Sequence, residues 1–184
     1  MFSQRTLFII LAITFGALSR LLPHPSNFTA IGAIALFGGA YLTNRYLAIL
    51  VPVIAVWFSD IVLNNTVYAQ AGQFVWFYEG AWLQYLSTAL CAVLGIVMMK
   101  RVNAPRFIGS SVATALLFFV ITNLGVWYGS AMYSKSLGGL MQCYIAGVPF
   151  LGWAVLGNLF FGAILFGGFE LAGRRFPKLA LRKA

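Results

Sequence analysis

Residues 89–119, ALCAVLGIVMMKRVNAPRFIGSSVATALLFF, contain two apolar runs separated by a short basic turn. The turn holds Lys100, Arg101 and Arg106, and the apolar runs on either side of it contain no charged residue. In membrane proteins, Lys and Arg concentrate in the short loops on the cytoplasmic side. The stretch therefore predicts two membrane helices joined by a cytoplasmic turn.

The same alternation of apolar runs and basic ends extends over the whole chain. With the N-terminus placed inside, only Arg20 and Lys135 of the 12 Lys and Arg residues fall on the outer side. We therefore expect an all-α polytopic membrane protein with six transmembrane helices and both termini cytoplasmic. A spanning helix needs about 20 apolar residues, and the first two runs are shorter, so the count of six depends on the charge pattern. The runs lie near residues 7–22, 29–43, 46–63, 81–99, 107–129 and 149–172.

Composition supports a membrane protein over a soluble one. The chain is 61% hydrophobic and 8% charged, which is too apolar for a water-soluble surface. A net charge of +9 would suggest nucleic-acid binding in a soluble protein, but at cytoplasmic helix ends the basic residues meet anionic lipid headgroups. We expect residues 1–184 to form one integral domain of a bacterial inner membrane, with no nucleic-acid partner.

Motifs for catalysis are missing from the sequence. It contains no Walker A loop, no HExxH and no nucleophile elbow, and its His, Cys and acidic residues do not cluster at metal-ligand spacing. The sequence therefore predicts a protein that is not an enzyme and carries no resident cofactor.

Polar and aromatic residues gather in the connections predicted to lie outside, at 23–29, 64–80 and 130–148. Small-molecule sites combine apolar walls with a few placed polar groups, so these connections form a candidate ligand site. An alternative for the tryptophans is an interfacial aromatic belt, and one for Asp60 is a helix-end residue paired with Arg20. The candidate ligand-binding residues are His24, Asn27, Asp60, Gln73, Trp76, Tyr78, Trp82, Trp127, Tyr133 and Cys143.

A metal site built by the protein alone is not expected, because the single histidine cannot supply the three or four ligands of a zinc centre. His24 or Cys143 could be the one axial ligand of a metal already held in a macrocycle. The alternative for both residues is packing within a loop.

Small residues in the first two apolar runs allow helices to approach closely. Ala12 and Gly16 stand four positions apart in the first run. They suit either a docking face for another membrane protein or packing within the bundle.

Two segments resemble a known family. RLLPHPSNFTAIGAIALFGGAYL at 20–42 and ITNLGVWYGSAMYSKSLGGLMQCYIAGVPF at 121–150 are similar to bacterial transport proteins of the S-component class of energy-coupling factor (ECF) transporters. The nearest characterised relatives suggested by this resemblance are solitary cobalamin-binding S-components. His24, Asp60 and Tyr78 match residues of that group, whereas its cobalt-ligating cysteine in the third loop has no counterpart here.

The resemblance implies an S-component-like bundle that captures a vitamin-like molecule on its outer connections and reorients in the membrane. Cobalamin or a related corrinoid is the expected substrate. An ECF scaffold subunit and two ATPases are the implied partners, with Ala12 and Gly16 at the scaffold contact. Two other hypotheses remain: a membrane scaffold or assembly protein with no small-molecule substrate, and an intramembrane enzyme using Asp60, Glu79 and His24.

Overall fold

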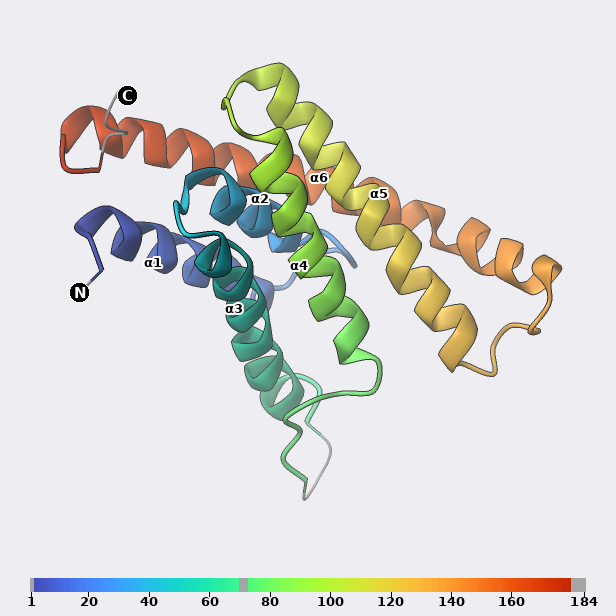
Figure 1. Cartoon of the computed structure of the whole chain (residues 1–184). Helices are drawn as coiled ribbons and strands as arrows, with labels where there is room; N and C mark the ends of the chain where they lie inside the picture. The colour runs from blue at the N-terminus through green and yellow to red at the C-terminus, as the bar shows by residue number, and fades with distance from the viewer. Residues whose placement is uncertain (1, 70–72, 180–184) are drawn as a thin grey trace.

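The computed structural model describes residues 2–69 and 73–179, and this part of the chain is all-helical. Six α-helices and one 3-10 turn follow one another along the described residues (Figure 1). The elements are α1 (Gln4–Leu18), η1 (Ser19–Leu21), α2 (Ile31–Tyr41), α3 (Arg45–Thr66), α4 (Ala81–Met98), α5 (Ala104–Gly129) and α6 (Leu137–Arg175).

Five of these segments are long and apolar enough to cross a membrane: α1 together with η1, α3, α4, α5 and α6. The exception is α2, which has 11 residues. At 1.5 Å per residue it is about 17 Å long, well short of a hydrocarbon core of about 30 Å. The chain is thus a multi-pass membrane protein by helix length and composition, and the predicted second crossing forms only a short internal helix.

Helix α2 is the centre of the bundle. Every residue from Ile31 to Gly38 is buried, and α2 contacts all five longer helices. Its glycines permit this packing: a Cβ on Gly39 would lie 2.5 Å from the Ala92 carbonyl oxygen of α4. The aromatic ring of Phe37 packs edge-on against Phe166 of α6, with 5.3 Å between ring centroids. The small residues of the second apolar run therefore serve internal packing.

Polar caps determine where the longer helices begin. The side-chain oxygen of Asn44 accepts from the backbone N–H groups of Tyr46 and Leu47 at the start of α3, and Asn103 caps α5 in the same way. Ser136 accepts from Gly139 N–H and starts α6. Such caps satisfy N–H groups that have no partner within the helix.

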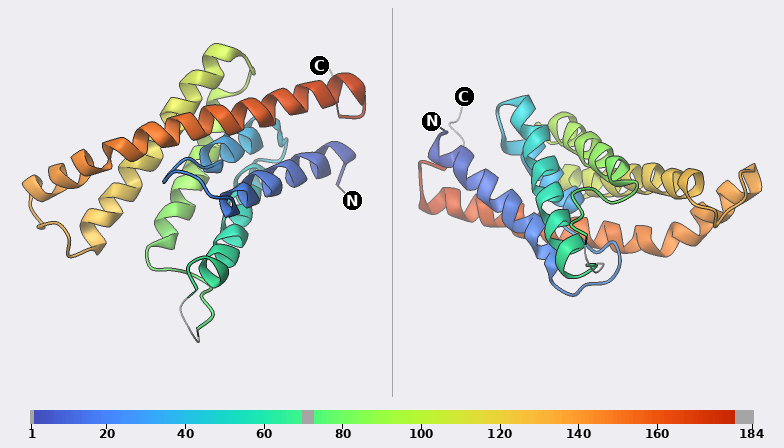
Figure 2. Two further views of the ribbon diagram at one scale, coloured as in Figure 1. Left: turned by 180° about the vertical axis from the view of Figure 1, so that it is seen from behind. Right: turned by 90° about the horizontal axis from the view of Figure 1, so that it is seen from below.

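The start of α6 corrects a prediction. We expected an outer connection over 130–148 and a helix from 149, but α6 runs unbroken from Leu137 to Arg175 and includes Pro149. A membrane helix tolerates an internal proline because neighbouring groups satisfy the freed carbonyl. Figure 2 shows α6 extending across one whole side of the molecule.

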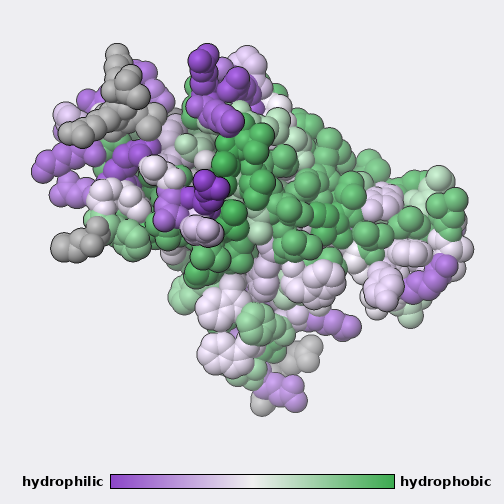
Figure 3. Space-filling view, viewed as in Figure 1, coloured by the Kyte–Doolittle hydropathy of each residue, from purple (hydrophilic) through white to green (hydrophobic). Residues whose placement is uncertain are grey.

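Hydrophobic and hydrophilic surfaces separate along the molecule. In Figure 3 hydrophilic side chains gather near the two chain ends and the turn between α4 and α5, and a hydrophobic band covers the middle of the view. The described parts of the connection after α3, at 67–69 and 73–80, and the connection at 130–136 lie away from that hydrophilic end (Figure 1). We call their side of the bundle the loop side.

Candidate ligand cavity

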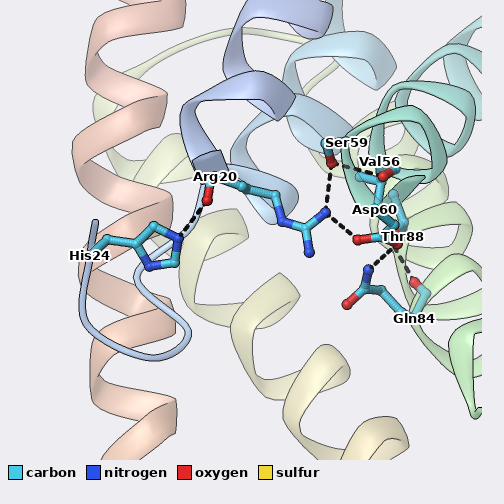
Figure 4. A network of polar contacts seen from close by, with 7 residues as sticks. All are labelled: Arg20, His24, Val56, Ser59, Asp60, Gln84 and Thr88. Carbon is cyan, nitrogen blue, oxygen red and sulfur yellow. Dashed lines mark hydrogen bonds and ion pairs between the residues drawn. The ribbon is translucent and has the colours of Figure 1, made fainter. Parts of the chain in front are cut away.

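An ion pair joins α1 to α3 on the loop side. Arg20, in the 3-10 turn after α1, donates from Nη1 to Asp60 Oδ1 at 2.6 Å and to Ser59 Oγ at 2.7 Å. From α4, Gln84 Nε2 donates to the other carboxylate oxygen of Asp60 at 2.8 Å (Figure 4). Asp60 is 2% exposed, and a buried carboxylate is tolerated only with such partners. The network fixes the ends of three helices relative to one another.

Beside this network lies a partly open cavity of about 700 Å³, which we call the outer chamber. Its wall comes from the connections at 26–27, 78–80 and 130–133, and from the loop-side parts of α4, α5 and α6. The lining residues are Ser26, Asn27, Tyr78, Glu79, Gly80, Leu83, Gln84, Phe118, Thr122, Asn123, Gly125, Val126, Gly129, Ser130, Tyr133, Cys143, Ala146, Gly147 and Phe150.

A second cavity of about 80 Å³, the inner chamber, lies at the N-terminal end of α2. Asn27, Gln84 and Phe118 line both chambers, so the two are neighbours. The inner chamber is also lined by Arg20, Thr29, Ile31, Gly32, Thr114, Ala115, Ala154 and Asn158.

Four of the predicted ligand residues line the outer chamber: Asn27, Tyr78, Tyr133 and Cys143. Asn27 adopts a left-handed backbone conformation with φ of 64°, a region that asparagine tolerates better than most residues. Burial raises the pKa of Tyr78, and the negative charge of Asp60 raises it further. The Tyr78 hydroxyl therefore stays protonated at physiological pH and can donate a hydrogen bond.

The other predicted ligand residues line neither chamber: His24, Asp60, Gln73, Trp76, Trp82 and Trp127. Asp60 accepts hydrogen bonds from Arg20 and Gln84, which do line the chambers. Trp127 stabilises the connection to α6, since its Nε1 donates to the Ser134 carbonyl oxygen at 2.9 Å. Trp76 and Trp82 are 56% and 65% exposed, as residues of an aromatic belt would be.

The two candidate axial ligands differ in placement. The His24 ring nitrogens face the carbonyl oxygens of Pro25 at 2.9 Å and Arg20 at 3.3 Å, so its contacts are within its own loop (Figure 4). Cys143 belongs to α6 and not to a loop, and its thiol donates to the Asn123 carbonyl oxygen at 3.3 Å. No group of three or more His, Cys, Asp or Glu residues that could hold a metal ion occurs among the described residues.

Several lining residues were not among the predicted ones. Glu79 stands beside Gly80, which is the N-cap of α4 and makes no side-chain cap bond. Gln84 of α4 and Asn123 of α5 also line the outer chamber. Gly125 and Gly147 face neighbouring side chains at short range: a Cβ on Gly125 would lie 2.0 Å from Leu83 Cδ1. Nothing in the sequence marks which glycines face a cavity, because this depends on how α4, α5 and α6 cross.

The predicted docking residues face the bundle interior. A Cβ on Gly16 would lie 2.6 Å from Ile34 Cγ2 of α2, and Ala12 packs against the same buried core. The exposed face of α1 carries large apolar side chains instead: Leu7, Leu11 and Phe15. Gly16 and Ala12 therefore contribute to packing within the bundle, which was one of the two alternatives, and a docking role for them stays a prediction.

A family model described as "Family of unknown function (DUF6580)" matches residues 1–179, nearly the whole chain. Comparisons with curated proteins and with solved structures find no match.

Proposed function

The chain belongs to this family of unknown function, and we propose from its cavity that it is a substrate-binding membrane protein of a micronutrient uptake system, similar to ECF S-components. The observation that supports the proposal is the outer chamber of about 700 Å³ on the loop side of a membrane bundle. Pockets for small molecules commonly measure about 300 to 1,000 Å³ and combine apolar walls with few polar groups. The outer chamber falls within this range of volume, and apolar residues such as Leu83, Phe118 and Phe150 line it together with polar ones.

The ligand in this proposal enters from the loop side, which is the outer side of a bacterial inner membrane. The charge pattern supports that orientation. The start of α1, the turn between α4 and α5 and the end of α6 lie at the opposite, hydrophilic end (Figure 1), and these segments carry Arg5, Lys100, Arg101 and Arg174. The segment from the end of η1 to the end of α2 then forms the second of six passes, as a loop followed by a short helix. Release inside requires the bundle to reorient, which an ECF scaffold and its ATPases would drive.

Cobalamin or a related corrinoid is the first substrate to test, because the resemblance points to it. If a residue of this chain ligates cobalt, Cys143 is better placed than His24, since only Cys143 lines the outer chamber. A corrinoid absorbs visible light, so its presence in purified protein is directly measurable.

The test is purification in mild detergent, followed by denaturation and mass spectrometry of the released small molecules together with a visible spectrum. The proposal predicts one compound at near-stoichiometric amount, or saturable binding when candidate vitamins are added. Protein that retains no compound and binds none of the candidate vitamins contradicts it.

One observation favours a second candidate function, a membrane scaffold or assembly protein. The connection between α3 and α4 exposes Tyr68, Phe74, Trp76 and Phe77, each more than half exposed. Aromatic residues are enriched in protein interfaces. Under this alternative, removing those aromatic rings disrupts a complex with a protein partner. The wild-type protein then binds no small molecule.

A further inference from the structure

The inner chamber contains hydrogen-bond donors that no described residue satisfies. The Arg20 side chain is 11% exposed, and its bonds to Ser59 and Asp60 both come from Nη1. No hydrogen bond joins Arg20 Nε or Nη2 to any residue in the described ranges, and Arg20 lines the inner chamber. Figure 4 shows the guanidinium turned with only one of its nitrogens toward the carboxylate.

The beginning of α2 adds further donors. Its N-cap is Ala30, which has no side chain able to accept from the first turn. Among the described residues, the backbone N–H groups of Ile31, Gly32 and Ala33 have no acceptor, although all three residues are buried. Buried helix ends need partners for these groups, and the helix dipole favours a negative charge at this position.

The negative charge of Asp60 does not face the inner chamber. Asp60 lines neither chamber, and its two oxygens accept from Arg20 and from Gln84. Asn158, which is 4% exposed, donates from Nδ2 to the Ser111 carbonyl oxygen and to Thr114 Oγ1. Its Oδ1 lies near Gly32 with no donor among the described residues. Among the described residues that line the inner chamber, Arg20 carries the one formal charge, which is positive.

We propose that the inner chamber binds a carboxylate group of the molecule that occupies the outer chamber. The assignment rests on the proposed function and narrows its substrate class to small molecules with a free carboxylate. Among corrinoids it therefore favours those with free acid groups over cobalamin, whose acid side chains are amides. A volume of about 80 Å³ suits a group of this size, since one water needs roughly 10–15 Å³. Arg20 would contact the carboxylate through Nε and Nη2, the edge that suits two-pronged binding, and Asp60 is a positioning residue that holds Arg20.

The test uses acetate, the smallest probe with this group, against acetamide, its neutral isostere. Purified protein in nanodiscs of zwitterionic phosphatidylcholine is titrated with each probe at constant ionic strength in chloride, and the unfolding temperature is measured. A saturable rise with acetate and none with acetamide is expected. Equal responses to the two probes would overturn the assignment.

Two variants check the location. Asn158→Asp places a second anion in the chamber while leaving the Arg20–Asp60 pair intact, and should weaken acetate binding by a factor of about 10 or more, the scale of one charge-assisted hydrogen bond. Asn123→Asp makes the same change in the outer chamber alone and should weaken it much less. Equal losses of acetate affinity in the two variants would contradict binding of acetate in the inner chamber.

Two further outcomes distinguish the binding of a carboxylate ligand from the binding of a lipid headgroup and from the uptake function itself. If discs that contain phosphatidylserine abolish the acetate response, a lipid headgroup occupies the chamber and the assignment to a ligand is wrong. If the protein retains a vitamin-like compound that lacks a carboxylate, the carboxylate assignment is wrong while the proposed uptake function stands.

Discussion

Arg20 Nη1 and Asp60 Oδ1 lie 2.6 Å apart, although 40 positions separate the two residues in the sequence. The pair connects the end of α1 to α3 and, through Gln84, to α4. It also fixes the edge of the guanidinium that faces the inner chamber. One ion pair thus links the packing of the bundle to the candidate site.

Removing one partner of this pair should strongly destabilise the protein. Asp60→Ala leaves a buried guanidinium charge without its counter-ion, and we expect a loss of about 3–5 kcal/mol in the free energy of unfolding. The double variant Arg20→Met with Asp60→Leu should lose much less, because it removes both charges. Unfolding by titration with SDS measures both, and Glu79→Ala, which alters an exposed carboxylate, is the control. A double variant as unstable as Asp60→Ala would contradict the argument.

A methyl group on Gly39 should disturb the contact between α2 and α4. The new Cβ would lie 2.5 Å from the Ala92 carbonyl oxygen and 2.7 Å from Ile96 N, both backbone atoms. Overpacking of this kind costs about 1–3 kcal/mol. Gly167→Ala, in α6, meets nothing within 4 Å, and should stabilise the helix slightly. Thermal unfolding compares the two variants, and equal unfolding temperatures would show that α2 packs less tightly than described.

Labelling with a membrane-impermeable maleimide tests the orientation. Single cysteines at Thr66 and Lys135, on the loop side, should react in intact cells. Cysteines at Asn103 and Lys178, at the hydrophilic end, should react only after the membrane is opened, because basic residues concentrate inside. Reaction at position 103 in intact cells would overturn both the orientation and the entry of ligand from outside.

Tyr78 should make stability depend on pH in the alkaline range. Burial raises its pKa in the folded protein, whereas an unfolded chain releases the phenol proton near pH 10. Above that pH the unfolded state binds fewer protons than the folded state, so stability falls as pH rises. Tyr78→Phe should reduce this fall between about pH 9 and pH 11, measured by unfolding temperature. Tyr68→Phe, an exposed residue of the same connection, is the matched control, and an equal effect of both would contradict the assignment.

The helical membrane architecture could be predicted from the sequence because apolar runs and basic ends are local signals. The short length of α2 could not be predicted, because an apolar run such as 29–43 has the same composition whether it faces lipid or protein. The full extent of α6 was hidden by Gly138, Gly139 and Pro149, which usually interrupt helices in soluble proteins but do not interrupt this one.

The candidate site was predictable only in outline. Tyr78, Tyr133 and Cys143 were expected at a ligand site, and they do line the outer chamber. The pairing of Arg20 with Asp60, which was one of two alternatives, is confirmed. Trp76 and Trp82 line neither chamber, and the sequence could not decide their place because aromatic side chains suit both a pocket and a membrane interface. Asn123 and Gly129 were missed because their role depends on the angle at which α5 meets α6.

The most direct measurement compares ligand binding in two variants of α5. Gly129 lines the outer chamber and Gly109 does not, and a Cβ at either position meets nothing within 4 Å. Equilibrium binding of the compound released from wild-type protein should be weakened at least about tenfold in Gly129→Phe, since a large side chain there fills the space that the ligand needs. Gly109→Phe should bind as the wild type does. Unchanged affinity in a folded Gly129→Phe variant would show that the outer chamber is not where the ligand binds.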